Sequence, residues 1–167
     1  RDWDAAETES LKFAYEFRKK FPAVDMIDAY QFFAGLRIIK EDYELDLMRK
    51  AIKITTDGIA EMMKNAHANM YEYEIEAYFD YVLTKNGVRD KAFKTIAASG
   101  KRGTILHYSD NHALAEDGDL ILIDAGAQVD WYNGDISRTF PVNGKFTPLQ
   151  KQIYDIVLSG QQKVIDT

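Results

Sequence analysis

Apolar residues recur at helical spacing in four stretches of the 167-residue chain. The first stretch predicts a helix over residues 4–20, which ends at Phe21-Pro22 because proline disfavours helical backbone in the residue before it. The second predicts a helix over residues 42–65, and the acidic residues at its start suit the positive end of a helix dipole. Steps of three and four place one apolar stripe on this helix, formed by Leu45, Met48, Ile52, Thr55, Ile59 and Met62.

The third helical stretch covers residues 73–85 and ends at Asn86-Gly87, a pair suited to a left-handed C-terminal cap. The fourth begins at Thr147-Pro148, which combines an N-capping hydroxyl with proline at the first helical position. Residues 30–36 form an apolar stretch to which the pattern assigns no element. Between the third and fourth helices, short β-like runs separated by glycines predict a sheet, at residues 95–98, 120–123 and 131–142.

Composition and charge exclude several classes of protein. Hydrophobic residues make up 46% of the chain and charged residues 29%, which is the balance of a globular domain. With 21 basic and 27 acidic residues the net charge is −6, and because the basic residues do not cluster we expect no binding to nucleic acid. The absence of cysteine excludes thiolate chemistry and agrees with a cytoplasmic location. The apolar run at residues 120–123 stops at Asp124, so no membrane span is predicted.

Two aspartates in the predicted sheet are the main candidates for chemistry. A tight turn centred on Val129-Asp130 would place Asp124 opposite Asp135, with their Cβ atoms roughly 5 Å apart. Like charges at that spacing destabilise a sheet unless a cation lies between them, and carboxylate oxygens suit Mn²⁺, Mg²⁺ or Fe²⁺. Without a metal, Asp124 would end its strand in a turn and Asp135 would pair with Arg138 or a lysine. Spacing alone leaves both interpretations open.

The chain has three histidines, of which His107 is the best placed for a function. It lies between an apolar run and an acidic stretch, where it would ligate a metal, donate a proton, or serve only as a core or surface side chain. His112 would form a pair of metal ligands with His107 only in a special loop geometry, and His67 lies at a predicted helix end. We therefore expect no site role for these last two.

Two segments that contain the aspartates resemble the metal-binding hairpin of the aminopeptidase P family. They are Ile123-Asp124-Ala125-Gly126 and the longer run Gly134-Asp135-Ile136-Ser137-Arg138-Thr139-Phe140-Pro141-Val142-Asn143-Gly144-Lys145-Phe146-Thr147. His107 matches the histidine of a Leu-His-Tyr segment that the family has upstream of its first aspartate. The stretch Ala34-Gly35-Leu36-Arg37 is also similar, so the resemblance covers roughly residues 34–167.

The resemblance implies an α+β fold, namely the first half of the family's pita-bread catalytic domain, with helices packed on a curved and mainly antiparallel sheet. Residues 39–167 would belong to that domain, and residues 1–38 would be the tail of an amino-terminal domain and a linker. Asp124 would chelate one metal ion and Asp135 would bridge two, usually Mn²⁺, while His107 would contact the substrate. The family's remaining ligands, one His and two Glu, lie further downstream than this chain extends.

By the same resemblance, the full-length parent would be a metal-dependent exopeptidase that releases the residue before a penultimate proline, and it would form a homo-oligomer. The chain begins with Arg and its last residues lie within a helical pattern, so we expect a piece of that parent which is inactive alone. Prolidase and methionine aminopeptidase share the fold and the aspartates, but residues 138–144 look closest to aminopeptidase P. A catalytically inactive binding module, or a creatinase-like hydrolase without metal, would not need two facing acids.

Overall fold

The computed structural model describes residues 8–167, which divide into two compact units at Lys40. The first unit contains α1 (Glu9–Lys20) and α2 (Tyr30–Ile38). The first predicted helix is confirmed from Glu9 onward, and the rest of it, residues 4–7, lies outside the described residues. The helix α2 is a finding that the sequence pattern missed, because its aromatic and aliphatic side chains leave no polar face to reveal a helical period.

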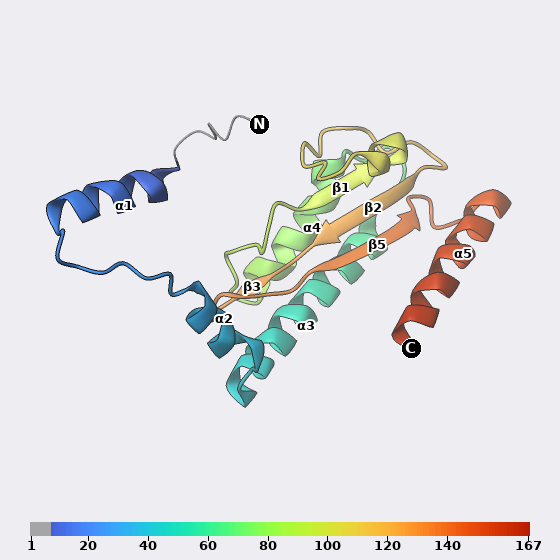
Figure 1. Cartoon of the computed structure of the whole chain (residues 1–167). Helices are drawn as coiled ribbons and strands as arrows, with labels where there is room; N and C mark the ends of the chain where they lie inside the picture. Colours follow the sequence, from blue (N-terminus) through green and yellow to red (C-terminus); the bar gives the residue numbers. More distant parts are fainter. Residues whose placement is uncertain (1–7) are drawn as a thin grey trace. The chain divides into compact units, whose positions relative to one another are not determined.

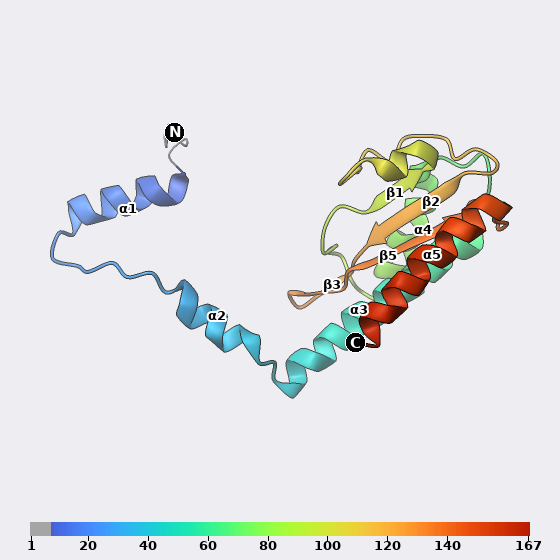
Figure 2. The ribbon, with the colours of Figure 1, turned by 45° about the vertical axis from the view of Figure 1, so that its right-hand side comes forward.

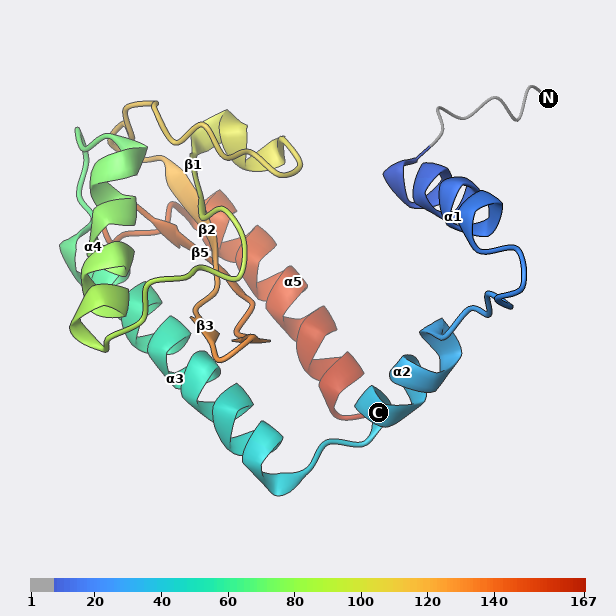
Figure 3. The same ribbon diagram turned by 90° about the vertical axis from the view of Figure 1, so that its left-hand side faces the viewer.

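The second unit begins with two helices that pack against each other, α3 (Asp42–Asn65) and α4 (Glu72–Lys85). Both confirm the predicted helices, and α4 returns alongside α3 (Figure 3). The predicted apolar stripe of α3 is buried at Thr55 and beyond. The predicted stripe is wrong at Ile52, which is 44% exposed. Ile54 lies on the buried face of the helix instead.

The sheet has three antiparallel strands in the order β1-β2-β5, namely β1 (Ile96–Ser99), β2 (Leu120–Ala125) and β5 (Ile136–Pro141). A short ribbon, β3 (Gln128–Val129) with β4 (Tyr132–Asn133), extends the hairpin that joins β2 to β5. The helices α3 and α4 cover one face of the sheet (Figure 1). The α+β class with an antiparallel sheet is therefore confirmed.

The strand β2 shows how the sheet separates its two faces. Ile121 and Ile123 are fully buried and belong to the core that α3 and α4 complete. Leu122 and Asp124 alternate with them and are only half-buried, so they point to the other face. The carboxylate of Asp124 therefore lies on the sheet face that the two helices leave uncovered.

The last element, α5 (Pro148–Ile165), confirms the fourth predicted helix and its start. The hydroxyl of Thr147 accepts a hydrogen bond from the backbone N–H of Gln150, and the Gln150 side chain accepts one from Thr147 N–H in return. Figure 2 shows α5 as the last helix before the C-terminus, and none of its residues is buried. A groove of about 540 Å³ is lined by residues of α5, β2 and β5. Among residues 8–167, no helix is both long and apolar enough to cross a membrane.

Candidate metal centre

The hairpin that carries both aspartates has a different register from the predicted one. Asp124 is paired with Ser137, not with Asp135, because the turn is centred on Asp130-Trp131. These two turn residues have φ values of 46° and 71°, the left-handed backbone that a type I′ hairpin turn requires. The predicted register is thus wrong by two residues. An even shift keeps every side chain on its face of the sheet, so Asp135 still shares a face with Asp124.

The two carboxyl groups meet despite the shifted register. The pKa of Asp135 is raised above its ordinary value of 3.8, first by partial loss of hydration, then by the charge of Asp124 and a hydrogen bond between the two side chains. The hydroxyl of Ser137 donates to Asp124 Oδ1 at 3.0 Å and so orients this carboxylate. The pair is a site of concentrated negative charge on the open face of the sheet.

The alternative without a metal does not describe this hairpin. Asp124 lies within β2 and not in a turn. No lysine, arginine or histidine nitrogen in the described part of the chain lies within 4.0 Å of either aspartate. The guanidinium of Arg138 donates instead to the backbone carbonyl of Ser137 at 2.7 Å. Within the described residues, no direct ion pair with a basic side chain therefore offsets the repulsion between the carboxylates.

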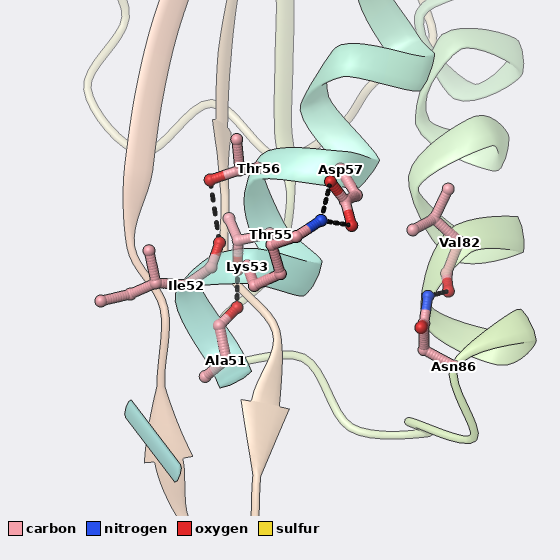
Figure 4. Close-up of polar contacts among 8 residues, drawn as sticks. All are labelled: Ala51, Ile52, Lys53, Thr55, Thr56, Asp57, Val82 and Asn86. Carbon is pink, nitrogen blue, oxygen red and sulfur yellow. Dashed lines mark hydrogen bonds and ion pairs between the residues drawn. The ribbon is translucent and has the colours of Figure 1, made fainter. Parts of the chain in front are cut away.

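A close backbone contact fixes the base of the hairpin against α3. A Cβ atom on Gly126 would lie 2.0 Å from the carbonyl oxygen of Gly134, and one on Gly134 would lie 2.4 Å from Thr55 Oγ1. Thr55 is fully buried, its hydroxyl donates to Ala51 O at 2.8 Å (Figure 4), and it accepts from Ala127 N–H at 2.9 Å. Gly126 follows Asp124 closely and Gly134 precedes Asp135, so this contact sets where both carboxylates emerge.

His107 lies on the loop after the short 3₁₀ helix η1 (Gly100–Thr104), with an exposed side chain and a φ of 53°. It borders a cavity of about 400 Å³ together with both aspartates. The full lining is Phe93, Lys94, Ile96, His107, Ser109, Asp124 and Asp135. The structure thus brings all three predicted site residues to one cavity, although they come from three separate segments.

The other two histidines are engaged elsewhere. His67 Nδ1 lies 2.9 Å from the carbonyl oxygen of Ala68, and His112 Nδ1 contacts the carbonyl oxygen of Asp110. Neither borders the cavity. The structure therefore does not bring His67 or His112 together with His107 and the two aspartates.

The donor atoms fit a hard divalent cation, but only part of a coordination shell is present. Two carboxylates provide at most four oxygens, whereas Mn²⁺ or Mg²⁺ takes about six ligands. Within residues 8–167 there is no cluster of three or more His, Asp or Glu side chains that would hold a metal ion. The hairpin is therefore one half of a possible site, and the remaining ligands would have to come from outside these residues.

Sequence reasoning missed several residues that shape the site. Ser137 was part of the resembling run but received no role, although the correct register would have paired it with Asp124. Thr55 was assigned to an apolar stripe, which hid the two hydrogen bonds of its hydroxyl. Phe93 and Lys94 precede β1 in a loop without periodicity, so no sequence signal placed them at the cavity.

Comparison with known proteins gives a consistent result. The sequence profile of metallopeptidase family M24 matches residues 46–167 of this chain. The Xaa-Pro aminopeptidase of Escherichia coli strain K12 is 43% identical over 135 residues, which is 81% of this chain and 31% of that protein. This chain spans about a third of the length of the curated relatives it matches.

Two solved structures show the same likeness in three dimensions. A Bacillus anthracis protein assigned as an aminopeptidase P is 49% identical with a TM-score of 0.86, over 95% of this chain and 38% of that one. A zinc-substituted E. coli aminopeptidase P in complex with product is 34% identical with a TM-score of 0.85, again over 95% of this chain and 38% of the other.

Proposed function

The chain belongs to metallopeptidase family M24, and from that premise we propose that its full-length parent is an Xaa-Pro aminopeptidase that releases the first residue of peptides with proline in second position. One observation carries the proposal. The carboxylates of Asp124 and Asp135 meet in a cavity that His107 also borders, and no basic nitrogen of residues 8–167 lies within 4.0 Å of either carboxylate. The names of the relatives that match over most of this chain support the same substrate class.

The proposed cofactor is a pair of divalent metal ions, with Mn²⁺ as the expected metal. Asp124 would hold one ion and Asp135 would bridge both, and the hydrogen bond from Ser137 would keep Asp124 in place. The metal ions, when bound, would supply an activated water nucleophile and electrostatic stabilisation of the oxyanion. Only oxygen donors from the hairpin take part, which suits a hard cation such as Mn²⁺.

His107 would act on the substrate and not on the metals. Its side chain is exposed at the cavity, and within residues 8–167 no hydrogen bond occupies either ring nitrogen. An imidazole in that position can donate a hydrogen bond to the peptide carbonyl or pass a proton to the leaving amine. Aromatic and aliphatic residues beside it, Phe93 and Ile96, would limit the access of water.

Assembly and location are further parts of the proposal. We propose a homo-oligomeric parent; the exposed apolar side chains of α5, among them Leu149, Ile153 and Val157, suit burial against further protein, which is either the rest of the parent chain or a second copy. The absence of cysteine supports a cytoplasmic location.

The function is tested by assaying the full-length protein with Mn²⁺ on three substrates. They are a longer peptide that begins Xaa-Pro, an Xaa-Pro dipeptide, and a peptide that begins with methionine and lacks proline. The proposal requires cleavage of the longer Xaa-Pro peptide. Cleavage of the dipeptide alone would indicate a prolidase, and release of methionine alone would indicate a methionine aminopeptidase.

A matched variant connects the activity to the aspartate pair. Asp135→Asn removes one carboxylate of the pair, whereas Asp130→Asn makes the same change in the exposed turn of the same hairpin. Asparagine tolerates the left-handed backbone at position 130, so the control should fold and cleave normally. Equal activity of the two variants would contradict the proposed role of Asp135.

A further inference from the structure

Glu72 is an acidic side chain buried completely within the second unit. It lies in the first turn of α4, and in the described part of the chain no lysine, arginine or histidine nitrogen comes within 4.0 Å of it. Four donors surround it instead. Oε1 accepts from the N–H and the hydroxyl of Ser99, both at 2.7 Å. Oε2 accepts from the Tyr108 hydroxyl at 2.7 Å and from Ala113 N–H at 2.9 Å.

A buried carboxylate in this setting is costly, so its presence requires a reason. Removing such a group from water is unfavourable, and the four donors and the positive end of the α4 dipole offset this loss of hydration. An apolar side chain of similar volume would fill the same space without that cost. What only the carboxylate provides is simultaneous attachment of α4 to three other points of the chain.

Those points enclose the loop that carries His107. Ser99 ends β1 immediately before the loop, and Tyr108 and Ala113 lie within its second part. Tyr108 directly follows His107, so a tyrosine held inward by Glu72 fixes the backbone that presents His107 outward to the cavity. Burial and then the hydrogen bond to Glu72 raise the pKa of Tyr108 above its ordinary value of 10, in agreement with a hydroxyl that donates to a carboxylate.

A second acidic residue on α4, Glu76, lies one turn after Glu72 and also binds the loop. Glu76 Oε2 accepts from the side-chain amide of the buried Asn111 at 2.7 Å, and that amide also bonds to Ala97 N–H and Thr95 O. Both attachments run from one face of α4 to the same loop. The loop is thus held by polar side chains and not by an apolar core.

We propose that Glu72 is a positioning residue for the reaction, which holds Tyr108 inward and thereby sets the place of His107 opposite Asp124 and Asp135. This inference rests on the proposed function, because it assumes that His107 contacts the substrate. Glu72 itself touches neither the cavity nor the substrate. Its effect passes through the Tyr108 hydroxyl to the backbone of the loop.

The test uses the full-length protein with Tyr108→Phe, which deletes one donor, and Glu72→Gln, which deletes the charge and keeps the shape. Tyr78→Phe is the matched control, because it removes a tyrosine hydroxyl from a half-buried position on α4 itself. Hydrogen exchange is measured by mass spectrometry over residues 103–113, with β2 and α3 as internal references. Metal content, kcat and KM are measured on the same samples.

We expect Tyr108→Phe to raise exchange in the loop about tenfold or more, the worth of one hydrogen bond to a charged group, with β2 and α3 unchanged. Activity should fall through kcat at unchanged metal content, because a displaced His107 impairs the transition state more than substrate binding. Glu72→Gln should have a larger effect, and Tyr78→Phe none. Unchanged exchange in the loop, or equal acceleration in all three regions, would overturn the proposal.

The exchange measurement also separates this inference from the proposed function. If the loop loosens as expected while kcat and metal content do not change, Glu72 holds the loop but His107 has no role in the reaction. If the loop does not loosen, the positioning role is wrong whatever the activity. Tyr108→Phe keeps the test valid if Glu72→Gln fails to fold, because it leaves three donors on Glu72.

Discussion

The two sides of the cavity are built by different physical means. On the aspartate side, β2 and β5 pair along their whole length, Gly126 lies against the backbone of Gly134, and Gly134 lies against α3. On the histidine side, the loop of residues 100–113 is attached through hydrogen bonds from Tyr108 and Ala113 to Glu72 and from Asn111 to Glu76. The aspartate side therefore depends on shape, whereas the histidine side depends on polar partners.

The difference has a consequence for how each side responds to change. Added volume at the hairpin has nowhere to go, because backbone lies against backbone there. The loss of a single donor has a small effect on a paired hairpin but a large effect on a loop held by few bonds. A metal site needs fixed carboxylates, whereas the position of His107 depends on the hydrogen bonds that hold its loop.

The largest expected effect is on the aspartate side. In the full-length protein, Asp135→Asn should abolish occupancy by two metal ions and with it the activity, because the bridging carboxylate is lost. Metal content by mass spectrometry after purification with Mn²⁺ gives the answer. Asp130→Asn should retain both ions, and two ions per protein in Asp135→Asn would refute the assignment.

On the histidine side, His107→Ala should leave both metal ions bound and slow the reaction by about 10²–10⁴-fold, the range for a group that moves a proton or stabilises a transition state. His112→Ala is the control, since that histidine does not border the cavity. Steady-state kinetics and metal content are needed together. Metal loss equal to that of Asp135→Asn would make His107 a ligand and the division of roles wrong.

Gly134→Ala tests the dependence of the hairpin on shape. The added Cβ would lie 2.4 Å from Thr55 Oγ1 and 3.0 Å from Ala51 O, so we expect a loss of about 1–3 kcal/mol in the free energy of unfolding. Gly160→Ala, where nothing lies within 4 Å of the added atom, should stabilise α5 slightly. Urea unfolding followed by circular dichroism compares the two. Similar free energies of unfolding for both variants would show that the hairpin accommodates a Cβ atom at position 134 and does not depend on close packing there.

The smallest effect concerns pH. The raised pKa of Asp135 means that the folded state holds its proton more tightly than the unfolded state. This contribution to stability is present below the ordinary pKa of 3.8 and is lost as the pH rises through the raised pKa. In the presence of a chelator at pH 7, the Asp135→Asn variant should therefore have a free energy of unfolding that is a few tenths of a kcal/mol higher than that of the unmutated protein. This is the size expected for like charges on neighbouring strands.

That gain should disappear at pH 3, where the carboxyl group is protonated. Urea midpoints at the two pH values measure the change. If Asp135→Asn is less stable than the unmutated protein at pH 7 without metal, the two aspartates do not repel each other in the folded state.

The sequence could predict those parts of the fold that have a period. The helices α3 and α4 follow from apolar spacing because each buries one face, and α5 follows from its apolar period and its Thr147-Pro148 start. The three strands follow from short apolar runs between glycines. The helix α2 could not be found this way. Its side chains are mostly apolar, and the two polar ones, Gln31 and Arg37, are six residues apart and form no polar stripe. Its N-cap residue is Ala29, although Tyr30 N–H donates a hydrogen bond to Asp28 at 2.8 Å.

The sequence predicted the three site residues but not the hairpin register or the buried residue that holds the loop. Asp124, Asp135 and His107 were identified, and the structure brings them to one cavity. The hairpin register was missed although a signal existed, since valine at position 129 seldom adopts a positive φ while the turn needs two such residues. Glu72 gave no signal, because its partners lie 27 to 41 residues away along the chain and it resembles any acid in a first helical turn.

The central claim is that Asp124 and Asp135 form one half of a two-metal centre. Calorimetric titration with Mn²⁺ tests it directly, on the full-length protein and on this 167-residue chain side by side. The full-length protein should bind two ions with micromolar or tighter affinity. The chain should bind far more weakly, because two carboxylates leave most coordination positions to water. Two ions bound at micromolar affinity by the chain alone, or none by the full-length protein, would contradict the account.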